Sequence, residues 1–594
     1  MKKIRLDSPR ARARLAVVLS ALAFAVLIAV FFRTQVLRAG PDVLVQQGNR
    51  LRAVPLPAAR GDIVDRNGVV LAGTAAGTAL VLMPAPRDSV RRRLDRVGQL
   101  LDLPRAWRER TERAVLAAAR PYVITTELRP AEVGMLAAHQ RELSGVLVEP
   151  WPQRVYPAGL ASMPVVGTVG LEPWPAGTGE NVAGANAGHP VGRAGLELAF
   201  DSLLAGEPGI RYVEMDEAGS VVMDPTRSTY REPRPGRALR TRLDADLQRR
   251  VAELLPTRTP SAAVVLEIAS GDVLALLSHP VRPPAADEES ALPENAAIGR
   301  VEEPGAIFQP ITAAVALEAG RIDAERPQAV PCRGGMRYGE RYFRCWLPDG
   351  HGQLALAGAI REACDVYFHQ VSLRLGLRML LEAGARLGLD RPSGLELREE
   401  RPGHFPTGVP DLASRLGRAP NPSDALDLGT GRGLNQTTLL RMVHAYAALA
   451  AGGAAPAPRV TGNEPAPPPF RLELPPEATA LLLGALHAVT APGGPGAAAG
   501  QSMTAGTSIG GQIGRARRGE SGPRPTGWFV GIAGEEDAPA RIAVGVLVER
   551  APSDETAAAL AGRIADYYLR SVAADPAPQA RDTTTPSSTT VSSL

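Results

Sequence analysis

The sequence predicts an α+β protein in which a β-rich unit precedes a larger unit, a sheet flanked by helices. The larger unit begins with a β-branched run from Ser261, a turn at 269–272 and a second run to Ser278, which is a hairpin pattern. Further strands are expected near the C-terminal end, at 528–532 and 542–549, and apolar-periodic helical segments fill the sequence between. One sheet must therefore be assembled from distant segments, and 594 residues are too many for a single core.

An apolar run near the N-terminus predicts a membrane-spanning helix at residues 15–33. Ser20 is the only polar side chain between Leu15 and Phe32, and the run is about long enough to cross a hydrocarbon core. Basic residues outnumber acidic ones before it, so the positive-inside rule predicts a cytoplasmic N-terminus, with the bulk of the chain extracytoplasmic at the inner membrane. A cleaved signal peptide is the alternative, but the run is longer than a signal-peptide core and no clear cleavage site follows.

Charge argues against one class of function. The chain has 66 basic and 62 acidic residues and a net charge of +4, so it lacks the large excess of positive charge that is typical of nucleic-acid-binding proteins. Lys2 and Lys3 are the only lysines, so every later basic residue apart from histidine is an arginine.

Several motifs occur in a fixed order. Residues 60–72 read Arg-Gly-Asp-Ile-Val-Asp-Arg-Asn-Gly-Val-Val-Leu-Ala, followed by Gly-Arg-Ala-Gly-Leu-Glu at 192–197 and Gly-Glu-Pro-Gly at 206–209. This series resembles the pedestal domain of class B penicillin-binding proteins, the monofunctional peptidoglycan transpeptidases. The segment Phe343-Arg-Cys-Trp346, with Cys364-Asp-Val-Tyr-Phe368, is similar to the elongation-type branch, penicillin-binding protein 2.

The resemblance implies a division of the chain into five segments. They are a cytoplasmic tip (1–14), the transmembrane helix (15–33), the pedestal (34–235), a transpeptidase-like domain with the serine β-lactamase-like fold (236–572) and a disordered tail (573–594). A Pro, Gly and Arg-rich stretch marks the boundary near 235, and the tail has almost no large apolar residues.

The family's catalytic motifs are altered in this chain. Family members acylate a serine that is activated by a lysine three residues later on the same helical face, and Ala306 and Gln309 occupy these two positions. Alanine offers no nucleophile, and the glutamine amide does not accept a proton at physiological pH. The second motif, normally Ser-x-Asn or Ser-x-Asp, reads Ala363-Cys364-Asp365 and retains only the acid.

The third motif, Lys-Thr-Gly-Thr in the family, is interpreted as residues 504–507, Thr-Ala-Gly-Thr. The lysine that would attract the peptide carboxylate is then a threonine. Losing a nucleophile or base costs a comparable serine enzyme about a millionfold, so no active catalytic residue is expected. The degenerate positions are Ala306, Gln309, Ala363, Asp365, Thr504, Ala505 and Gly506. Rescue by the hydroxyl of Thr312, Ser502 or Thr504 would need a new base, for which His351 and His444 are poor candidates.

A metal site is predicted beside the second motif. Cys332, Cys345 and Cys364 are the only cysteines and share one 33-residue window with His351. Three thiolates and an imidazole form a tetrahedral set typical of structural zinc, and by resemblance zinc sites occur at this place in elongation-type members. The alternative is a Cys332–Cys345 disulfide with Cys364 as a free thiol, but the odd cysteine and the histidine favour zinc.

Three functions remain open, all in peptidoglycan biosynthesis and cell-shape maintenance. The first is an inactive transpeptidase that acts as a scaffold or activator of the SEDS glycosyltransferase with which class B members associate in the elongation complex. The second is an active D,D-transpeptidase that uses non-standard residues. The third is a non-covalent sensor that binds peptidoglycan stem peptides or muropeptides in the old cleft.

Overall fold

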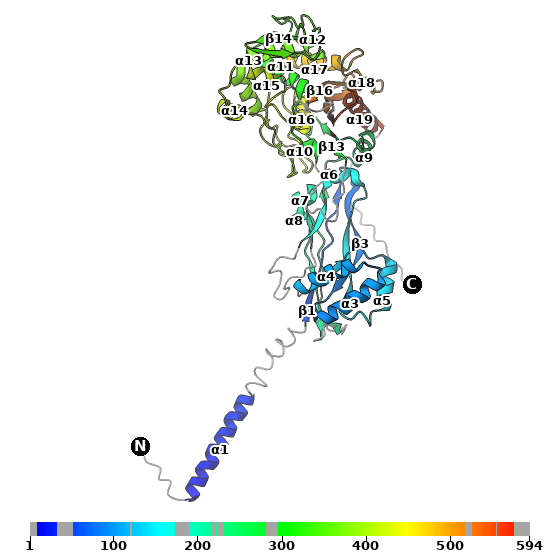
Figure 1. Ribbon diagram of the computed structural model, residues 1–594, viewed down its shortest axis with the longest axis vertical. Coiled ribbons are helices and arrows are strands. Elements are labelled where there is room, and N and C mark those ends of the chain that lie inside the picture. Colours follow the sequence, from blue (N-terminus) through cyan, green and yellow to red (C-terminus); the bar gives the residue numbers. More distant parts are fainter. Residues whose placement is uncertain are drawn as a thin grey trace, which may run out of the picture.

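The computed structural model describes residues 9–32, 51–118, 121–172, 189–216, 221–222, 230–280, 295–516, 526–553 and 555–574. Figure 1 shows an elongated molecule with helix α1 (Pro9–Phe32) at one end, a narrow strand-rich pedestal in the middle and a rounded domain at the other end. The first eight residues of the predicted tip and almost all of the predicted tail lie outside the described residues.

Helix α1 coincides with most of the segment for which the sequence predicts a membrane-spanning helix. Within the described residues, no helix reaches both the length and the apolar character that crossing a bilayer requires.

The pedestal is built around one long strand, β3 (Val70–Leu82). Its other strands are β1 (Leu51–Leu56), β2 (Ile63–Val64), β4 (Tyr122–Thr125), β5 (Val146–Val155), β6 (Val169–Glu172), β7 (His189–Gly192), β8 (Gly209–Met215), β9 (Val221–Val222), β10 (Tyr230–Arg231) and β11 (Leu239–Arg240). Strand β3 pairs with β2, β4 and β5, and β11 joins β2 in parallel. Strand β8 pairs with β1, β9 and β10, and β6 and β7 form a hairpin.

Helices cover one end of the pedestal sheet. The pedestal helices are α3 (Arg87–Leu100), α4 (Arg105–Ala118), α5 (Pro130–Ala138), η2 (Leu160–Ser162), α6 (Met163–Val166), α7 (Gly195–Ala199) and α8 (Asp201–Leu204). Val90, Leu94 and Val97 lie on one face of α3, as helical spacing dictates, and pack with Leu80 and Leu82 of β3. Figure 1 shows α3, α4 and α5 gathered at the end of the pedestal nearer α1.

The rounded domain contains the sheet that the sequence predicts from distant segments. Its strands are β12 (Ser261–Glu267), β13 (Val273–His279), β16 (Thr507–Ala516), β17 (Thr526–Glu535) and β18 (Ile542–Val548), in the order β13-β12-β18-β17-β16. All neighbours are antiparallel. Every residue of β18 is buried because helices cover both faces of the sheet, so the strand is a continuous apolar run with no alternation.

Two layers of helices enclose this sheet. One face packs against α9 (Ala245–Leu254) and α19 (Glu555–Ala574). The other side of the domain holds α10 (Ala296–Gly299), η3 (Gly305–Phe308), α11 (Gln309–Glu318), the hairpin β14 (Gly335–Tyr338) and β15 (Arg341–Arg344), α12 (Leu356–Arg361), α13 (Asp365–Arg386), α14 (Val409–Leu416), α15 (Asp424–Gly429), α16 (Leu439–Ala450), α17 (Pro476–Thr490) and α18 (Ala497–Gly500).

A buried ion cluster explains two of the pedestal motifs. The carboxylate of Glu197 is fully buried and accepts hydrogen bonds from Nε of Arg60 (3.0 Å) and Nε of Arg154 (2.5 Å). Arg60 also pairs with Asp201 at 2.8 Å, and Nη1 of Arg154 donates to the carbonyl oxygen of Gly61 at 3.0 Å. The first residue of the 60–72 motif is therefore joined to the last residue of the 192–197 motif through one carboxylate.

The pedestal is also joined firmly to the rounded domain. Oδ1 of Asp65 accepts from the backbone N–H of Asn67 (2.7 Å), which forms the turn, while Oδ2 accepts from the N–H of Ala245 (3.1 Å) at the start of α9. Oε1 of Glu399 accepts from the N–H of Gly195 at 2.6 Å. Apolar residues of both parts belong to one continuous core cluster, so the pedestal fixes the orientation of the rounded domain.

We predict that Glu197→Gln lowers the free energy of unfolding by about 3–5 kcal/mol, because it leaves buried guanidinium groups without their compensating charge. Denaturant unfolding of the purified chain measures the loss. Glu207→Gln is the matched control, since the Glu207–Arg234 pair is largely exposed and its loss should be hardly measurable. Equal losses in the two variants would contradict the role of the buried cluster.

Candidate functional site

Three of the predicted site residues are brought together at the junction of η3, α11 and α13. Ala306 lies in η3, and Gln309 begins α11 one turn later. The Gln309 side chain is fully buried, and its Nε2 donates to Oδ1 of Asp365 at 3.1 Å. The position of the missing lysine is thus filled by a neutral donor that is directed at the surviving acid of the second motif.

Asp365 is held from two sides. It begins α13, and its Oδ2 accepts from Nη2 of Arg432 at 3.1 Å. Burial raises the pKa of this carboxyl to about 6, although the Arg432 guanidinium opposes the shift. Ala363, the neighbouring position of the second motif, has a left-handed backbone with φ of 49°.

The predicted third motif is wrong in its placement. Thr504, Ala505 and Gly506 are exposed in the turn between α18 and β16, and they do not line the cavity beside Ala306. The backbone N–H of Thr504 donates instead to Oδ1 of Asp566 on α19, at 2.9 Å.

The residues that border the first motif come from the far end of β16. A Cβ added to Gly514 would lie 2.6 Å from the carbonyl oxygen of Pro304, and one added to Gly305 would lie 3.0 Å from that of Arg515. We therefore assign the place of Lys-Thr-Gly-Thr to the tetrad at 512–515, Gln-Ile-Gly-Arg, whose glycine lies against the first motif.

With this assignment, buried glutamines stand at both lysine positions of the family motifs. Gln512 is fully buried, and its Nε2 donates to the carbonyl oxygen of Ile360 at 2.7 Å. The signal that would have located it is the hairpin itself, because β16 precedes and pairs with β17, for which the sequence predicts a strand at 528–532. The similarity of Thr-Ala-Gly-Thr to the family motif led to a position eight residues too early in the chain.

These elements enclose a cavity of about 350 Å³, hereafter the cleft. Its lining consists of Ala306, Trp346, Ala363, Asp365, Arg432, Pro495, Ile513, Gly514, Arg515, Ser553 and Glu555. None of these described residues is a lysine or a histidine. The one hydroxyl among them belongs to Ser553, whose Oγ lies 3.1 Å from Oγ1 of Thr556.

The two histidines considered as substitute bases lie elsewhere. His444 is completely buried on α16, its Nε2 is 2.9 Å from the carbonyl oxygen of Pro456, and burial lowers its pKa to about 4. His351 belongs to the cysteine cluster. Neither of them lines the cleft.

The four predicted metal ligands converge. One ligand atom each from Cys332, Cys345, His351 and Cys364 lies within 4.8 Å of all the others, and no disulfide joins the cysteines. Nδ1 of His351 is 3.6 Å from Sγ of Cys332 and 3.5 Å from Sγ of Cys345. A tetrahedral zinc ion with Zn–S of about 2.3 Å and Zn–N of about 2.0–2.1 Å separates sulfur and nitrogen by about 3.6 Å, so the donor set fits zinc.

The cluster contains an acidic thiol. A hydrogen bond from the Cys364 thiol lowers the pKa of Cys345 to about 4, so the cluster readily holds a thiolate.

The cluster also borders the cleft. Cys364 lies between Ala363 and Asp365 in the sequence, and Trp346 follows Cys345. Nε1 of Trp346 donates to the carbonyl oxygen of Glu362 at 2.8 Å, which ties the two ligand segments together at the cleft wall.

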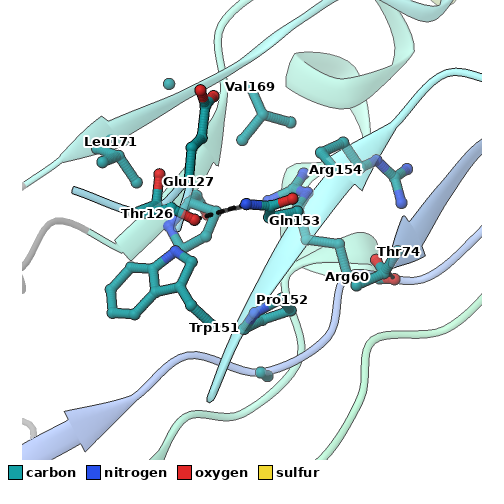
Figure 2. A pocket seen from close by; sticks show the side chains of 13 residues that line it. Arg60, Thr74, Thr126, Glu127, Trp151, Pro152, Gln153, Arg154, Val169 and Leu171 are labelled. Atoms are coloured by element: carbon teal, nitrogen blue, oxygen red, sulfur yellow. Dashed lines mark hydrogen bonds between the residues drawn. The ribbon is translucent and has the colours of Figure 1, made fainter. Parts of the chain in front are cut away.

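A second hollow, of about 240 Å³, lies in the pedestal. Figure 2 shows Trp151, Glu127 and Leu171 around it, and Gln153, whose Nε2 donates to the carbonyl oxygen of Thr126 at 2.5 Å. The arginines that line it are the members of the ion cluster around Glu197, so their charges already have protein partners.

Comparison with known proteins identifies the family. The family "Penicillin-binding Protein dimerisation domain" matches residues 55–241, and "Penicillin binding protein transpeptidase domain" matches residues 261–569. The chain belongs to the class B penicillin-binding proteins of the PBP2 type.

The relatives in this family include curated transpeptidases. Peptidoglycan D,D-transpeptidase MrdA of Escherichia coli K12 is 28% identical over 457 residues, covering 73% of this chain and 71% of the relative. Stage V sporulation protein D of Bacillus subtilis is 25% identical over 415 residues, covering 68% and 59%.

Solved structures share the fold. PBP2 of Helicobacter pylori in its complex with MreC has a TM-score of 0.70 at 19% identity, covering 88% of this chain and 99% of that one. A peptidoglycan synthase complex in which polymerization and crosslinking are coordinated includes a chain with a TM-score of 0.63 at 24% identity, covering 94% and 98%.

Proposed function

We propose that this chain is a non-catalytic PBP2-type protein of peptidoglycan synthesis during cell elongation, and that it acts as a scaffold or activator of a SEDS glycosyltransferase. The observation that carries the proposal is the chemistry of the cleft, where Ala306 replaces the nucleophile and Gln309 the base while the fold around them is complete. In this proposal α1 anchors the chain in the inner membrane and the remainder is extracytoplasmic.

The first-motif positions of the cleft, Ala306 and Gln309, carry neither the nucleophile nor the base of an acyl-transfer cycle. Formation of an acyl-enzyme requires a nucleophilic oxygen and a base to take its proton, and neither an alanine methyl nor an amide supplies them. Gln309 donates to Asp365 and Gln512 donates to Ile360, so both glutamines serve as hydrogen-bonding supports of the cleft.

The scaffold role is supported by the joint between pedestal and rounded domain. Because Asp65 and Glu399 bond across that joint, a partner that holds the pedestal also positions the rounded domain. The similar PBP2 of H. pylori forms a complex with MreC, and a similar chain occurs in a peptidoglycan synthase complex. We extend such elongation-complex partners to this chain.

We further propose that the Cys₃His cluster holds a structural zinc ion. Cys332, Cys345, His351 and Cys364 supply four ligand atoms that all lie within 4.8 Å of one another. With four protein ligands no coordination position stays open for catalysis, so the ion would contribute stability only.

We predict that a fluorescent penicillin does not label the native chain. The revertant Ala306→Ser, Gln309→Lys, Ala363→Ser, Gln512→Lys, Ile513→Thr, Arg515→Thr introduces the family's motif residues around the cleft, and covalent labelling should appear in gel fluorescence. Ala306→Ser alone is the control and should not be labelled by the penicillin, because no base accepts the proton of the new serine hydroxyl. Labelling of the native chain would overturn the non-catalytic proposal.

Zinc analysis tests the metal proposal. We expect about one zinc ion per chain by elemental mass spectrometry, and His351→Ala should lower both the metal content and the thermal midpoint, because metal binding contributes folding free energy. His404→Ala is the matched control, since His404 is exposed and outside the cluster, and it should change neither. Native protein that contains no stoichiometric metal would contradict the zinc proposal.

The partner proposal is tested in membranes. Replacing Pro9–Phe32 by an unrelated single-pass helix should reduce co-purification of the SEDS protein, because the proposed contact runs through the anchor and the pedestal. Ala306→Ser leaves this contact intact and should co-purify as the native chain does. Unchanged recovery after the helix exchange would argue against contact through α1.

A further inference from the structure

The helix pair α3 and α4 at one end of the pedestal is strongly basic. The two helices and the turn between them, residues 87–118, contain nine arginines and five acidic residues. This segment, hereafter the basic cap, therefore carries a net charge of +4, which equals the net charge of the whole chain. Positive charge concentrated on one surface attracts anions even where the rest of the molecule is balanced.

Most of these arginines remain available to a binding partner. Arg87 and Arg91 share one carboxylate, that of Glu112, and their side chains are still 70% and 52% exposed. Four further arginines of the basic cap are exposed and form no ion pair with any described residue, namely Arg92, Arg105, Arg110 and Arg113. Their guanidinium groups retain N–H donors, and these match the oxygens of a phosphate group.

Helical spacing places several of these arginines on the outer side of the helix pair. The apolar side of α3 packs on β3, and Arg92 lies on the opposite side of the helix. Thr111 and Val115 are buried positions of α4. Arg110 and Arg113 are therefore directed away from the core. The fold of the pedestal does not require these charges.

The basic cap lies at the end of the pedestal that follows the proposed membrane anchor. Figure 1 shows α3 and α4 close to β1, at the end of the pedestal nearer α1. Val54 of β1 packs in one core cluster with Met83, which follows β3 and precedes α3. Only 18 residues, 33–50, separate α1 from β1. With α1 in the inner membrane, the basic cap is the part of the pedestal nearest to the lipid headgroups.

We propose that the basic cap is a lipid-binding surface whose outer arginines contact the phosphate groups of anionic phospholipids in the outer leaflet of the inner membrane. Attraction between arginines and such a leaflet acts within about one Debye length, roughly 8–10 Å, so it holds the cap only at the bilayer surface. Because the pedestal is joined firmly to the rounded domain, this contact would also set the tilt of the whole extracytoplasmic part. The inference rests on the proposed anchor α1.

The test measures energy transfer between the basic cap and the bilayer, in nanodiscs that contain the full chain and no other protein. A fluorescent donor is attached to Ala137→Cys, an exposed position of the neighbouring helix α5, and the acceptor is a headgroup-labelled lipid. The chain without Ala137→Cys, treated with the same dye, corrects for reaction of the native cysteines.

Transfer should depend on lipid charge. We expect at least about twofold higher transfer in discs that contain phosphatidylglycerol than in discs of phosphatidylcholine alone, because only the former present an anionic surface. In about 0.5 M NaCl the transfer should fall to the phosphatidylcholine level, because salt screens exposed charges.

Two charge variants identify the surface. The triple variant Arg92→Gln, Arg105→Gln, Arg110→Gln should abolish the effect of phosphatidylglycerol. The matched control is Arg337→Gln, Arg344→Gln, Arg374→Gln, which removes the same charge from exposed arginines of the rounded domain that form no ion pair with a described residue. The control should keep the lipid dependence of the native chain.

Equal transfer in the two lipid compositions, or equal loss in the two triple variants, would overturn the lipid-binding surface. Arginines that bind an acidic protein instead would give equal transfer, because no such protein is present. Co-elution of the chain with phosphatidylcholine discs is read separately. A chain that co-elutes without lipid dependence contradicts only the lipid-binding surface, whereas a chain that does not co-elute contradicts the proposed anchor and this inference together.

Discussion

The carboxylate of Glu197 is the constraint on which the pedestal depends. It is fully buried between the guanidinium groups of Arg60 and Arg154, and a buried charge is tolerated only when it is paired and hydrogen-bonded. The cluster joins β5, α7 and the segment that leads from β1 to β2. The segment that it fixes, beginning at Arg60, then runs through the Asp65 turn and reaches α9, so order in the pedestal is transmitted to the rounded domain.

The cleft keeps its shape because Gln309 and Gln512 satisfy buried polar groups around it. Asp365 would be a buried carboxylate with one partner fewer if an apolar residue stood at position 309, but Gln309 donates to it and Arg432 supplies the opposite charge. Gln512 likewise satisfies the carbonyl of Ile360 at the end of α12. Proton transfer and structural support are therefore separate properties, and the hydrogen bonds of Gln309 and Gln512 supply the support.

The sequence predicted four of the five strands of the sheet, all except β16, and the convergence of Cys332, Cys345, His351 and Cys364, because strand periodicity and ligand chemistry are local signals. It also located the first two motifs, which lie at helix starts. The predicted position of the third motif was wrong for a physical reason. That position depends on the pairing of β16 with β17 and on the approach of Gly514 to Pro304, which are long-range contacts. A short match such as Thr-Ala-Gly-Thr contains no information about either contact. The sequence also did not predict the hydrogen bonds of the Glu197 cluster, although it identified the motifs at 60–72 and 192–197 that contain Arg60 and Glu197.

The backbone at Ala363 shows what holds the cleft wall in place. Its φ of 49° is a left-handed conformation that costs a non-glycine residue about 1–2 kcal/mol, and such a residue persists only where its surroundings determine it. Those surroundings are Cys364 in the metal-ligand cluster on one side and the last turn of α12 on the other, where the N–H of Ala363 donates to Ile360. An ion bound to Cys364 would therefore offset the strain at Ala363 and set the direction of Asp365. The cysteine cluster and the cleft are then one mechanical unit, because Cys364 connects Ala363 to Asp365 in the cleft wall.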